Sequence, residues 1–378
     1  MHNSDIAFQY DVLIDRVNFC NRHKEISKIN EMVDKHKKLV LYAPRRYGKT
    51  SLIKNIISHD FCKKHKGALV FYVNFMDVDS LEDITKRISN AVSSSLEKNY
   101  PVKTAFKTMA SYIKGMSLNI NFDGLTGLPS IELKPNYLNK SKELHELTNY
   151  ILNLSQKYPV FLILDEFQDI DHIPQATALL RTELQEFSNI PVAILGSKRQ
   201  LLSKMFASKN SAFFSFGDEL MLSNISPHDW LPYFNARLKK NRSSINEEAI
   251  IYLCEVLNNV PNSISEVGAW LSDNVSGIEI TPEAVSIQIQ DLINNKQESF
   301  YTQINFLSIN EKSVLKEIAM KRYVKETNSK AFLSMVKPSQ SAVTKIIKKL
   351  SDKGLLEFEI DLGYRLSDPL LSIFLCRY

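Results

Sequence analysis

Three consecutive residues, Gly48, Lys49 and Thr50, have the types and order of a site that binds phosphate. The apolar run 39–42 precedes them and the amphipathic segment 51–58 follows, so the pattern predicts a buried strand, a loop and a helix. Backbone N–H groups of such a loop, with the positive end of the helix, form a concave site for a phosphate group. The lysine reaches the outer phosphates of a nucleotide, and the threonine hydroxyl ligates magnesium.

The segment 43–50 matches the phosphate-loop pattern G-x-x-x-x-G-K-[ST], except that Ala43 replaces the first glycine. This replacement is tolerable only if position 43 does not need a positive φ. The residues expected to bind nucleotide in this segment are Ala43, Pro44, Arg45, Arg46, Tyr47, Gly48, Lys49, Thr50 and Ser51.

Two acids, Asp165 and Glu166, end a second apolar run. Downstream of a phosphate loop, we expect Asp165 to hold magnesium and Glu166 to orient and deprotonate the attacking water. Acids that merely cap a helix after a strand are the alternative interpretation. Ser197 ends a further apolar run and is a candidate to contact the γ-phosphate or the water, although serines at strand ends are also common turn residues.

Basic residues near these positions are candidates to neutralise phosphate charge, within the chain or at a neighbouring subunit. The alternative is that some of them are solvated surface residues. The candidates are Arg45, Arg46, Lys198 and Arg199, with Arg181 as a weaker one.

Strands and helices alternate along the first 226 residues, which predicts an α/β fold with a parallel sheet covered on both faces. The expected strands are 39–42, 68–75, 158–166, 191–197 and 217–222, and the expected helices are 19–37, 51–58, 80–98, 141–156 and 176–187. A hairpin is expected to be inserted at about 115–135. In such folds ligands lie at the carboxyl ends of the strands, where the candidate residues fall.

The rest of the chain is expected to form two further domains, a helical lid (227–304) and a winged helix-turn-helix (305–378). The lid contains four helical segments and no strand signal. The final domain contains helices at 310–319, 330–335 and 339–353, followed by the two-strand ribbon LLEFEID-LG-YRLSD. Three helices and a ribbon, with a basic third helix, are the winged helix-turn-helix pattern.

The third helix of this domain has a stripe of lysines at spacings of three and four residues. In a helix that reads DNA, the N-terminal residues contact base edges and the lysines contact phosphates. The alternative is a solvated helix face in a domain that binds only protein. The possible DNA contacts are Ser339, Gln340, Ser341, Thr344, Lys345, Lys348, Lys349 and Arg365.

The composition is that of an ordinary soluble protein, with 44% hydrophobic and 24% charged residues among 378. No apolar run is long enough to span a membrane, and the acidic N-terminal segment is not a secretory signal. The four cysteines are scattered without metal-ligand spacing, which favours a cytoplasmic location. Residues 305–378 contain 13 Lys and Arg against eight Asp and Glu, so the basic excess lies at the C-terminal end.

Together these segments resemble the archaeal-type ATPases of the AAA+/STAND branch of P-loop NTPases, over nearly the whole chain. The segments that carry the resemblance are FCNRHKE, YAPRRYGKTSL, LILDEFQDI, LLRTELQ, ILGSKRQLLSKMF and GYRLSDPLLSIFL. The resemblance implies ATP and Mg²⁺ as cofactors, with Lys49, Glu166 and Ser197 in catalysis and Thr50 and Asp165 at the metal.

The resemblance also implies nucleotide contacts outside the phosphate loop. Phe19 and Arg22 match the segment that lies against the adenine, and Pro261 matches a lid proline that approaches the nucleotide. Asn258 and Asn259 stand where the family has glycines. The lid segment SISEVGAWL lacks the arginine of ring-forming AAA+ proteins, which favours a switch, monomeric or oligomeric only with nucleotide, over a constitutive hexameric motor.

The resulting hypothesis is an ATP-hydrolysing switch, whose nucleotide state repositions a winged helix that contacts duplex DNA or a protein partner. The alternative is a DNA-binding or scaffold protein that keeps ATP or ADP as a structural ligand with little turnover. A small-molecule kinase is disfavoured, because phosphoryl transfer to a metabolite needs neither this lid nor a winged helix.

Overall fold

The structure is a computed structural model. It describes residues 6–99, 118–122, 129–133, 140–197, 199–359 and 361–377. The chain divides into two compact units, which we call the sheet unit and the helical unit. The sheet unit comprises Arg22–Pro44 and Lys49–Ser223, and the helical unit comprises Met1–Asn21, Arg45–Gly48 and Asn224–Tyr378.

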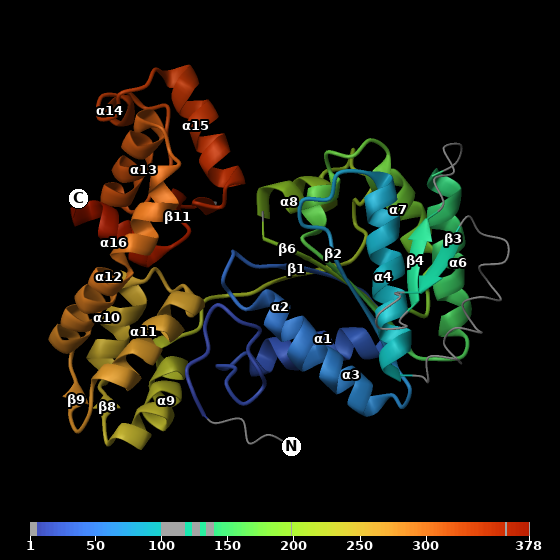
Figure 1. The fold of residues 1–378 in the computed structure, drawn as a ribbon, viewed down its shortest axis with the longest axis horizontal. Coiled ribbons are helices and arrows are strands. Elements are labelled where there is room, and N and C mark those ends of the chain that lie inside the picture. Colours follow the sequence, from blue (N-terminus) through green and yellow to red (C-terminus); the bar gives the residue numbers. More distant parts are fainter. Residues whose placement is uncertain are drawn as a thin grey trace. The chain divides into compact units, whose positions relative to one another are not determined.

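The sheet unit is built on a five-stranded parallel sheet of order β2-β5-β6-β1-β7 (Figure 1). All five expected strands are confirmed. They are β1 (Lys38–Tyr42), β2 (Leu69–Asn74), β5 (Val160–Asp165), β6 (Val192–Gly196) and β7 (Asp218–Met221). Strand β1, which leads into the phosphate loop, pairs with β6 on one side and β7 on the other.

Helices cover both faces of this sheet, as expected for a parallel sheet whose strands are apolar throughout (Figure 1). On one face, Phe61 packs against Phe161 of β5, with ring centroids 5.5 Å apart. On the other, Phe71 and Ile194 join one apolar core with the α4 side chain Ile88. The helices are α1 (His23–Asp34), α3 (Ser58–Lys64), α4 (Leu81–Asn99), α6 (Lys140–Ser155), α7 (Ala176–Gln185) and α8 (Arg199–Ala207).

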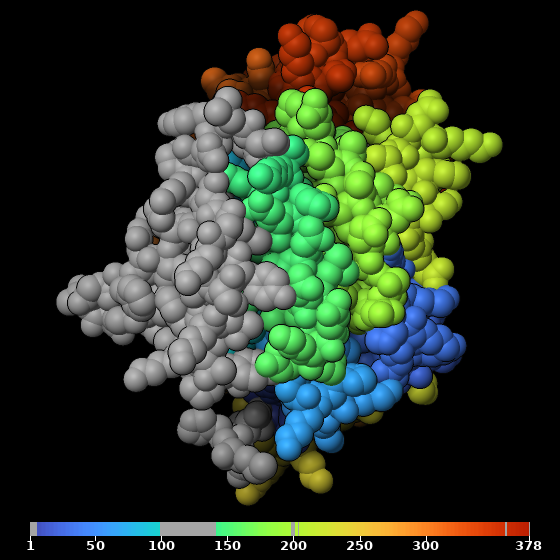
Figure 2. All heavy atoms as spheres, turned by 90° about the vertical axis from the view of Figure 1, so that its right-hand side faces the viewer, coloured from blue at the N-terminus to red at the C-terminus, as the bar shows by residue number. Residues whose placement is uncertain are grey.

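Helices α6 and α7 lie side by side on the face seen in Figure 2. The Thr148 hydroxyl on α6 donates to Glu183 on α7, and His145 Nδ1 lies 3.1 Å from the same carboxylate. The expected hairpin is confirmed by the antiparallel pair β3 (Leu118–Phe122) and β4 (Pro129–Leu133).

The first two expected helices differ most from the expectation. Helix α1 begins at His23 rather than Phe19, because Asn21 and Arg22 have positive φ angles of 52° and 72°. The expected helix 51–58 is not one α-helix. It comprises α2 (Lys49–Ser51), a π-helical segment η1 (Leu52–Ile57) and then α3. This wider turn accompanies the burial of four apolar side chains, Leu52, Ile53, Ile56 and Ile57.

The helical unit contains the four helices expected between residues 227 and 304. They are α9 (Pro227–Leu238), α10 (Glu247–Val256), α11 (Pro261–Asn274) and α12 (Pro282–Asn305). The expectation that this segment contains helices only was wrong, because β8 (Ser244–Ile245) and β9 (Glu279–Ile280) form a short parallel ladder. Two residues a strand are too few to give a periodic signal.

The expected winged helix follows, with α13 (Ile309–Lys321), α14 (Lys330–Leu333), α15 (Gln340–Asp352), β10 (Leu356–Glu359) and β11 (Gly363–Leu366). A further helix, α16 (Pro369–Arg377), was not expected, and its Phe374 is fully buried. The expected domain boundary at 304/305 falls at the end of α12. Phe234 of α9 and Phe374 nevertheless belong to one continuous apolar core. No helix in the described ranges is long and apolar enough to cross a membrane.

Glu311 closes the start of α13 with a capping box. Its carboxylate accepts from the Ser308 backbone N–H at 2.7 Å, and the Ser308 hydroxyl accepts from the Glu311 N–H at 3.3 Å. Lys349 pairs with the same carboxylate at 2.8 Å, and its hydrogen bond, followed by that of Ser308, lowers the pKa of Glu311 to about 2.

We expect Glu311→Ala to destabilise the chain by about 1–2 kcal/mol at pH 7, because the cap is lost. A folded-state pKa below the ordinary 4.5 stabilises the protein above that pH, and the stabilisation disappears as pH falls toward 2. Thermal unfolding at several pH values measures this, with the exposed Glu326→Ala as control. Equal melting temperatures for the two variants at pH 7 would contradict the assignment.

Candidate functional site

The carboxyl ends of β1 and β5, the two strands that flank β6, bring Lys49, Asp165 and Glu166 together in the sheet unit. Lys49 Nζ lies 3.4 Å from Glu166 Oε1 and 3.9 Å from Asp165 Oδ1. The Lys49 side chain is 6% exposed and that of Asp165 3%. A lysine buried so deeply needs compensating charge, which these two carboxylates provide. The structure therefore places the three strongest candidates from the sequence in one charged cluster.

Asp165 also accepts hydrogen bonds from two hydroxyls. Thr50 Oγ1 donates to its Oδ2 at 2.8 Å, and Tyr72 of β2 donates to the same oxygen at 2.9 Å. Burial and the neighbouring Asp165 raise the pKa of Tyr72, which keeps its hydroxyl protonated as a donor. Oxygen ligands of this kind, completed by nucleotide phosphates, are the set that Mg²⁺ prefers, so Thr50 and Asp165 fit the implied metal.

Glu166 is held in an orientation that its own backbone does not favour. Its φ is 49°, in the left-handed region that non-glycine residues seldom adopt. Gln168 Nε2 and Ser197 Oγ donate to Glu166 Oε2 at 2.6 and 2.8 Å. Burial alone would raise the pKa of Glu166, but the Lys49 charge and the hydrogen bonds from Gln168, Ser197 and Lys49 outweigh it and lower the pKa. The carboxylate is thus ionised at neutral pH.

Two residues of this site, Tyr72 and Gln168, were not among the sequence candidates. Tyr72 lies in the middle of a strand, where an aromatic residue is ordinary. Gln168 lies two residues after the acids, within the quoted segment LILDEFQDI, so that segment contained the only available signal.

The phosphate loop has the backbone that its sequence requires. Ala43 is not among the residues with positive φ, so no glycine is needed there. Gly48 has a φ of +77°, and the Phe19 ring lies 3.6 Å from the point where a Cβ of Gly48 would be. The backbone conformation at position 48 therefore requires a glycine.

The other nucleotide candidates occupy ordered positions in their own units. Arg22, 2% exposed, donates to the Ser223 carbonyl at 2.6 Å and pairs with Glu25 at 3.1 Å. Pro261 is buried as the first residue of α11. Asn258 and Asn259 have φ angles of 50° and 54°, so they adopt the left-handed conformation that glycines would take. Contact of Phe19, Arg22 and Pro261 with nucleotide stays a prediction.

Among the basic candidates, Arg181 makes its hydrogen bonds within the sheet unit. Its guanidinium donates to the Ala212 carbonyl at 3.1 Å and to Gln185 Oε1 at 3.0 Å. Lys198 lies outside the described residues. Arg46, in the helical unit, pairs with Asp368 at 3.1 Å.

The candidate DNA contacts divide into exposed and occupied residues. The exposed ones, without a carboxylate partner within 4 Å in the described part of the chain, are Ser339, Gln340, Ser341, Thr344, Lys345 and Lys348. Lys349 is exposed but pairs with Glu311. Arg365 differs from the expectation. Its side chain is 0% exposed and pairs with Glu357 and Glu359, so it does not lie on the surface where DNA would bind.

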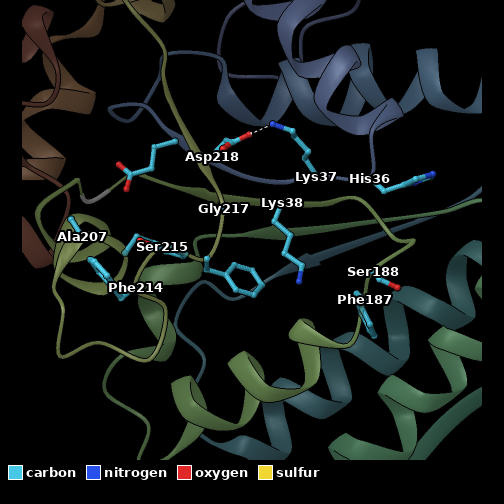
Figure 3. Close-up of a pocket in the computed structure, with 13 residues that line it drawn as sticks. His36, Lys37, Lys38, Phe187, Ser188, Ala207, Phe214, Ser215, Gly217 and Asp218 are labelled. Atoms are coloured by element: carbon cyan, nitrogen blue, oxygen red, sulfur yellow. Dashed lines mark hydrogen bonds and ion pairs between the residues drawn. The ribbon is translucent and has the colours of Figure 1, made fainter.

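A separate cavity of about 730 Å³ lies at the amino ends of β1 and β7 (Figure 3). The candidate site lies at the carboxyl ends of the strands. The cavity's cations already have partners, because Lys37 pairs with Asp218 at 2.7 Å and Lys38 Nζ lies 4.7 Å from the centre of the Phe216 ring. The exposed Glu219 also lines the cavity, so its lining shows no clear preference for an anion or a cation.

Comparisons with known proteins agree with this architecture. Residues 19–202 match the family model of an ATPase domain predominantly from Archaea, and residues 298–377 match that of a probable winged helix domain. A Walker-type ATPase of Pyrococcus abyssi has a similar structure, with 15% identity and a TM-score of 0.59 over 96% of this chain and 97% of that one.

Two proteins of Aeropyrum pernix are also similar in structure. ORC2 in ADPNP–ADP complexes has 15% identity and a TM-score of 0.53, over 98% of this chain and 97% of that one. ORC1 in complex with DNA has 13% identity and a TM-score of 0.52, over 97% and 94%. Identities at this level show a shared fold. Comparison with curated proteins gives no match.

We expect Lys49→Met to lower the stability of the nucleotide-free chain by about 3 kcal/mol at pH 7, because it leaves two buried carboxylates without their cation. In the wild type, folding lowers the pKa of Glu166 below its ordinary value of 4.5, so the ionised carboxylate stabilises the folded protein at pH values above 4.5. In the variant, burial is no longer offset by the lysine and the pKa rises, so the stability deficit shrinks as pH falls toward 4.5.

Thermal unfolding at pH 7 and pH 4.5 tests this, beside the exposed Lys204→Met as control. A deficit that is independent of pH would mean that Lys49 contributes packing rather than charge.

Proposed function

The chain belongs to the archaeal-type P-loop ATPases with a C-terminal winged helix, and on this premise we propose that it is a magnesium-dependent, slowly hydrolysing ATP switch. Its nucleotide state changes the position of a winged helix that contacts duplex DNA or a protein partner. The proposal includes a cytoplasmic location, and a chain that is monomeric or oligomeric only with nucleotide.

The cluster of Lys49, Asp165 and Glu166 carries the hydrolytic part of the proposal. The Lys49 ammonium, now balanced by two carboxylates, is placed to bind oxygens of the outer phosphates. The Thr50 hydroxyl and the Asp165 carboxylate would hold magnesium, which supplies charge neutralisation at those phosphates.

Glu166 is the residue suited to act on the attacking water. Its lowered pKa leaves it ionised at neutral pH, so it can accept a proton. The donors Gln168 and Ser197 both bind Oε2, which leaves Oε1 for Lys49 and for water. Ser197 therefore acts through Glu166 in this arrangement.

The alternative is a scaffold that binds ATP without appreciable turnover. A scaffold needs the phosphate loop but gains nothing from an ionised, oriented carboxylate. The backbone strain at Glu166, with φ of 49°, favours the enzyme, because strained residues persist where the surrounding structure holds them for a task.

The winged helix supports a contact with duplex DNA through the start of α15. Its polar residues and the lysines Lys345 and Lys348 are exposed. One structural neighbour, ORC1 of Aeropyrum pernix, was solved in complex with DNA. Lysines on an exposed helix would contribute phosphate contacts without sequence preference.

We expect Glu166→Gln to bind ATP as the wild type does and to hydrolyse it about 10²–10⁴-fold more slowly, because the general base is lost and the shape is kept. Phosphate release and equilibrium binding of ATP are measured for both proteins, each with and without duplex DNA.

Three outcomes separate the hypotheses. A rate that requires Glu166 and rises with DNA supports a DNA-coupled ATPase. If ATP hydrolysis requires Glu166 but its rate does not change with DNA, the result supports a protein partner for the winged helix. Absent turnover in both proteins, with ATP still bound, would refute the enzyme and leave the scaffold.

We expect the double change Lys345→Ala with Lys348→Ala to weaken duplex DNA binding and to reduce the dependence of log K on log salt by about 2. The control is Lys240→Ala, an exposed lysine outside the winged helix. Fluorescence anisotropy at several salt concentrations measures both. An unchanged salt slope would place the DNA, if any is bound, elsewhere.

A further inference from the structure

Two arginines of the phosphate loop, Arg45 and Arg46, contact the winged helix inside the helical unit. Arg46 Nη1 lies 3.1 Å from Asp368 Oδ2. The carboxylate of Asp368 is only 12% exposed. Asp368 directly precedes α16, so the side chain of a loop that binds phosphate is held by the end of the winged-helix ribbon.

Asp368 performs two separate tasks with its two oxygens. Oδ1 accepts the backbone N–H groups of Leu370 and Leu371 at 2.9 and 3.4 Å, which caps the start of α16. Oδ2 holds Arg46. The charge of Asp368 can therefore be removed while its capping is retained, if the replacement is another good capping residue.

The neighbouring loop residues lie close to the same ribbon and to the turn that precedes it. Gly354 has φ of +72°, and a Cβ there would lie 1.8 Å from Arg45 Nη1, so the Arg45 guanidinium packs on the bare backbone. Tyr47 is 5% exposed. Burial is the main reason that the pKa of Tyr47 rises to about 12. The charge of Arg365 opposes this rise, and the carboxylates of Glu359 and Glu357 add to it.

Three carboxylates, those of Asp368, Asp11 and Glu266, act on the charge of Arg46. Burial alone would lower the pKa of Arg46, but Asp368, Asp11 and Glu266 outweigh it and raise the pKa. An arginine in a phosphate loop is an obvious partner for a nucleotide phosphate, since its planar fork matches phosphate oxygens as well as it matches carboxylates. Asp368 and a phosphate group are thus competing partners for one guanidinium.

We propose that Asp368 is a positioning residue of the winged helix that withholds Arg46 from the nucleotide phosphates, so that the winged helix restrains ATP binding at the loop. Transfer of Arg46 to a phosphate breaks its pair with the start of α16. This inference rests on the proposed ATP switch and gives it a physical connection between loop and winged helix. A partner that displaces the winged helix from the loop therefore tightens ATP binding. Because coupling between two binding sites is reciprocal, ATP tightens the binding of that partner by the same factor.

The test is Asp368→Asn, which keeps a capping oxygen and the shape and removes the charge. We expect ATP to bind about fivefold more tightly, the low end of typical coupling between sites. Asp368→Ser, a second uncharged capping residue, gives the same direction. The measurement is equilibrium binding of a fluorescent ATP analogue with magnesium to the full chain, with no turnover required.

Two further proteins make the result specific. In an Arg46→Met background, Asp368→Asn is expected to have no effect, because the restraint acts through Arg46. Asp218→Asn is the matched control, since it removes the carboxylate of another ion pair, with Lys37, remote from the loop in the sequence. It leaves the affinity unchanged.

The outcomes separate this inference from the proposed function. Unchanged or weaker ATP binding in both Asp368 variants overturns the restraint alone, as does an effect that persists in the Arg46→Met background. If the wild type binds no ATP, the proposed function fails and the restraint fails with it.

Discussion

The charge of one buried lysine constrains the centre of the sheet unit. Lys49 must follow a tight loop to bind phosphate, and in that place it is almost removed from water. An ammonium group there is stable only beside carboxylates, and β5, two strands away in the sheet, ends in Asp165 and Glu166. Donors from Tyr72, Gln168 and Ser197 then satisfy the carboxylates. Without nucleotide, the site is thus neutralised by the groups that we propose act on ATP.

The phosphate loop belongs to two environments at once. Its flanks, Ala43 and Lys49, belong to the sheet unit, whereas Arg45–Gly48 belong to the helical unit together with the winged helix. In the switch that we propose, a ligand that reorganises these four residues alters their contacts within the helical unit.

Cations in the winged helix differ in whether a carboxylate pairs with them. Arg365 is enclosed with Glu357 and Glu359 and holds the ribbon together, and Lys349 supports the start of α13 through Glu311. Lys345 and Lys348 are exposed on the same helix as Lys349 and have no such partner within 4 Å among the described residues. The basic excess of this segment is therefore only partly available to a nucleic acid.

The sequence alone predicted the five strands, the four helices of the lid and the first three helices of the winged helix, and it singled out Lys49, Asp165 and Glu166, because apolar periodicity and loop motifs are local signals. It did not predict the partners Tyr72 of Asp165 and Asp368 of Arg46, which are far away in the chain. Periodicity tells which residues are buried but not what they touch. Arg365 and Lys345 are both cations near the C-terminus, and only packing decided that one is internal and the other exposed. That decision depends on how the ribbon meets the carboxylates of Glu357 and Glu359, a matter of tertiary contact and charge compensation.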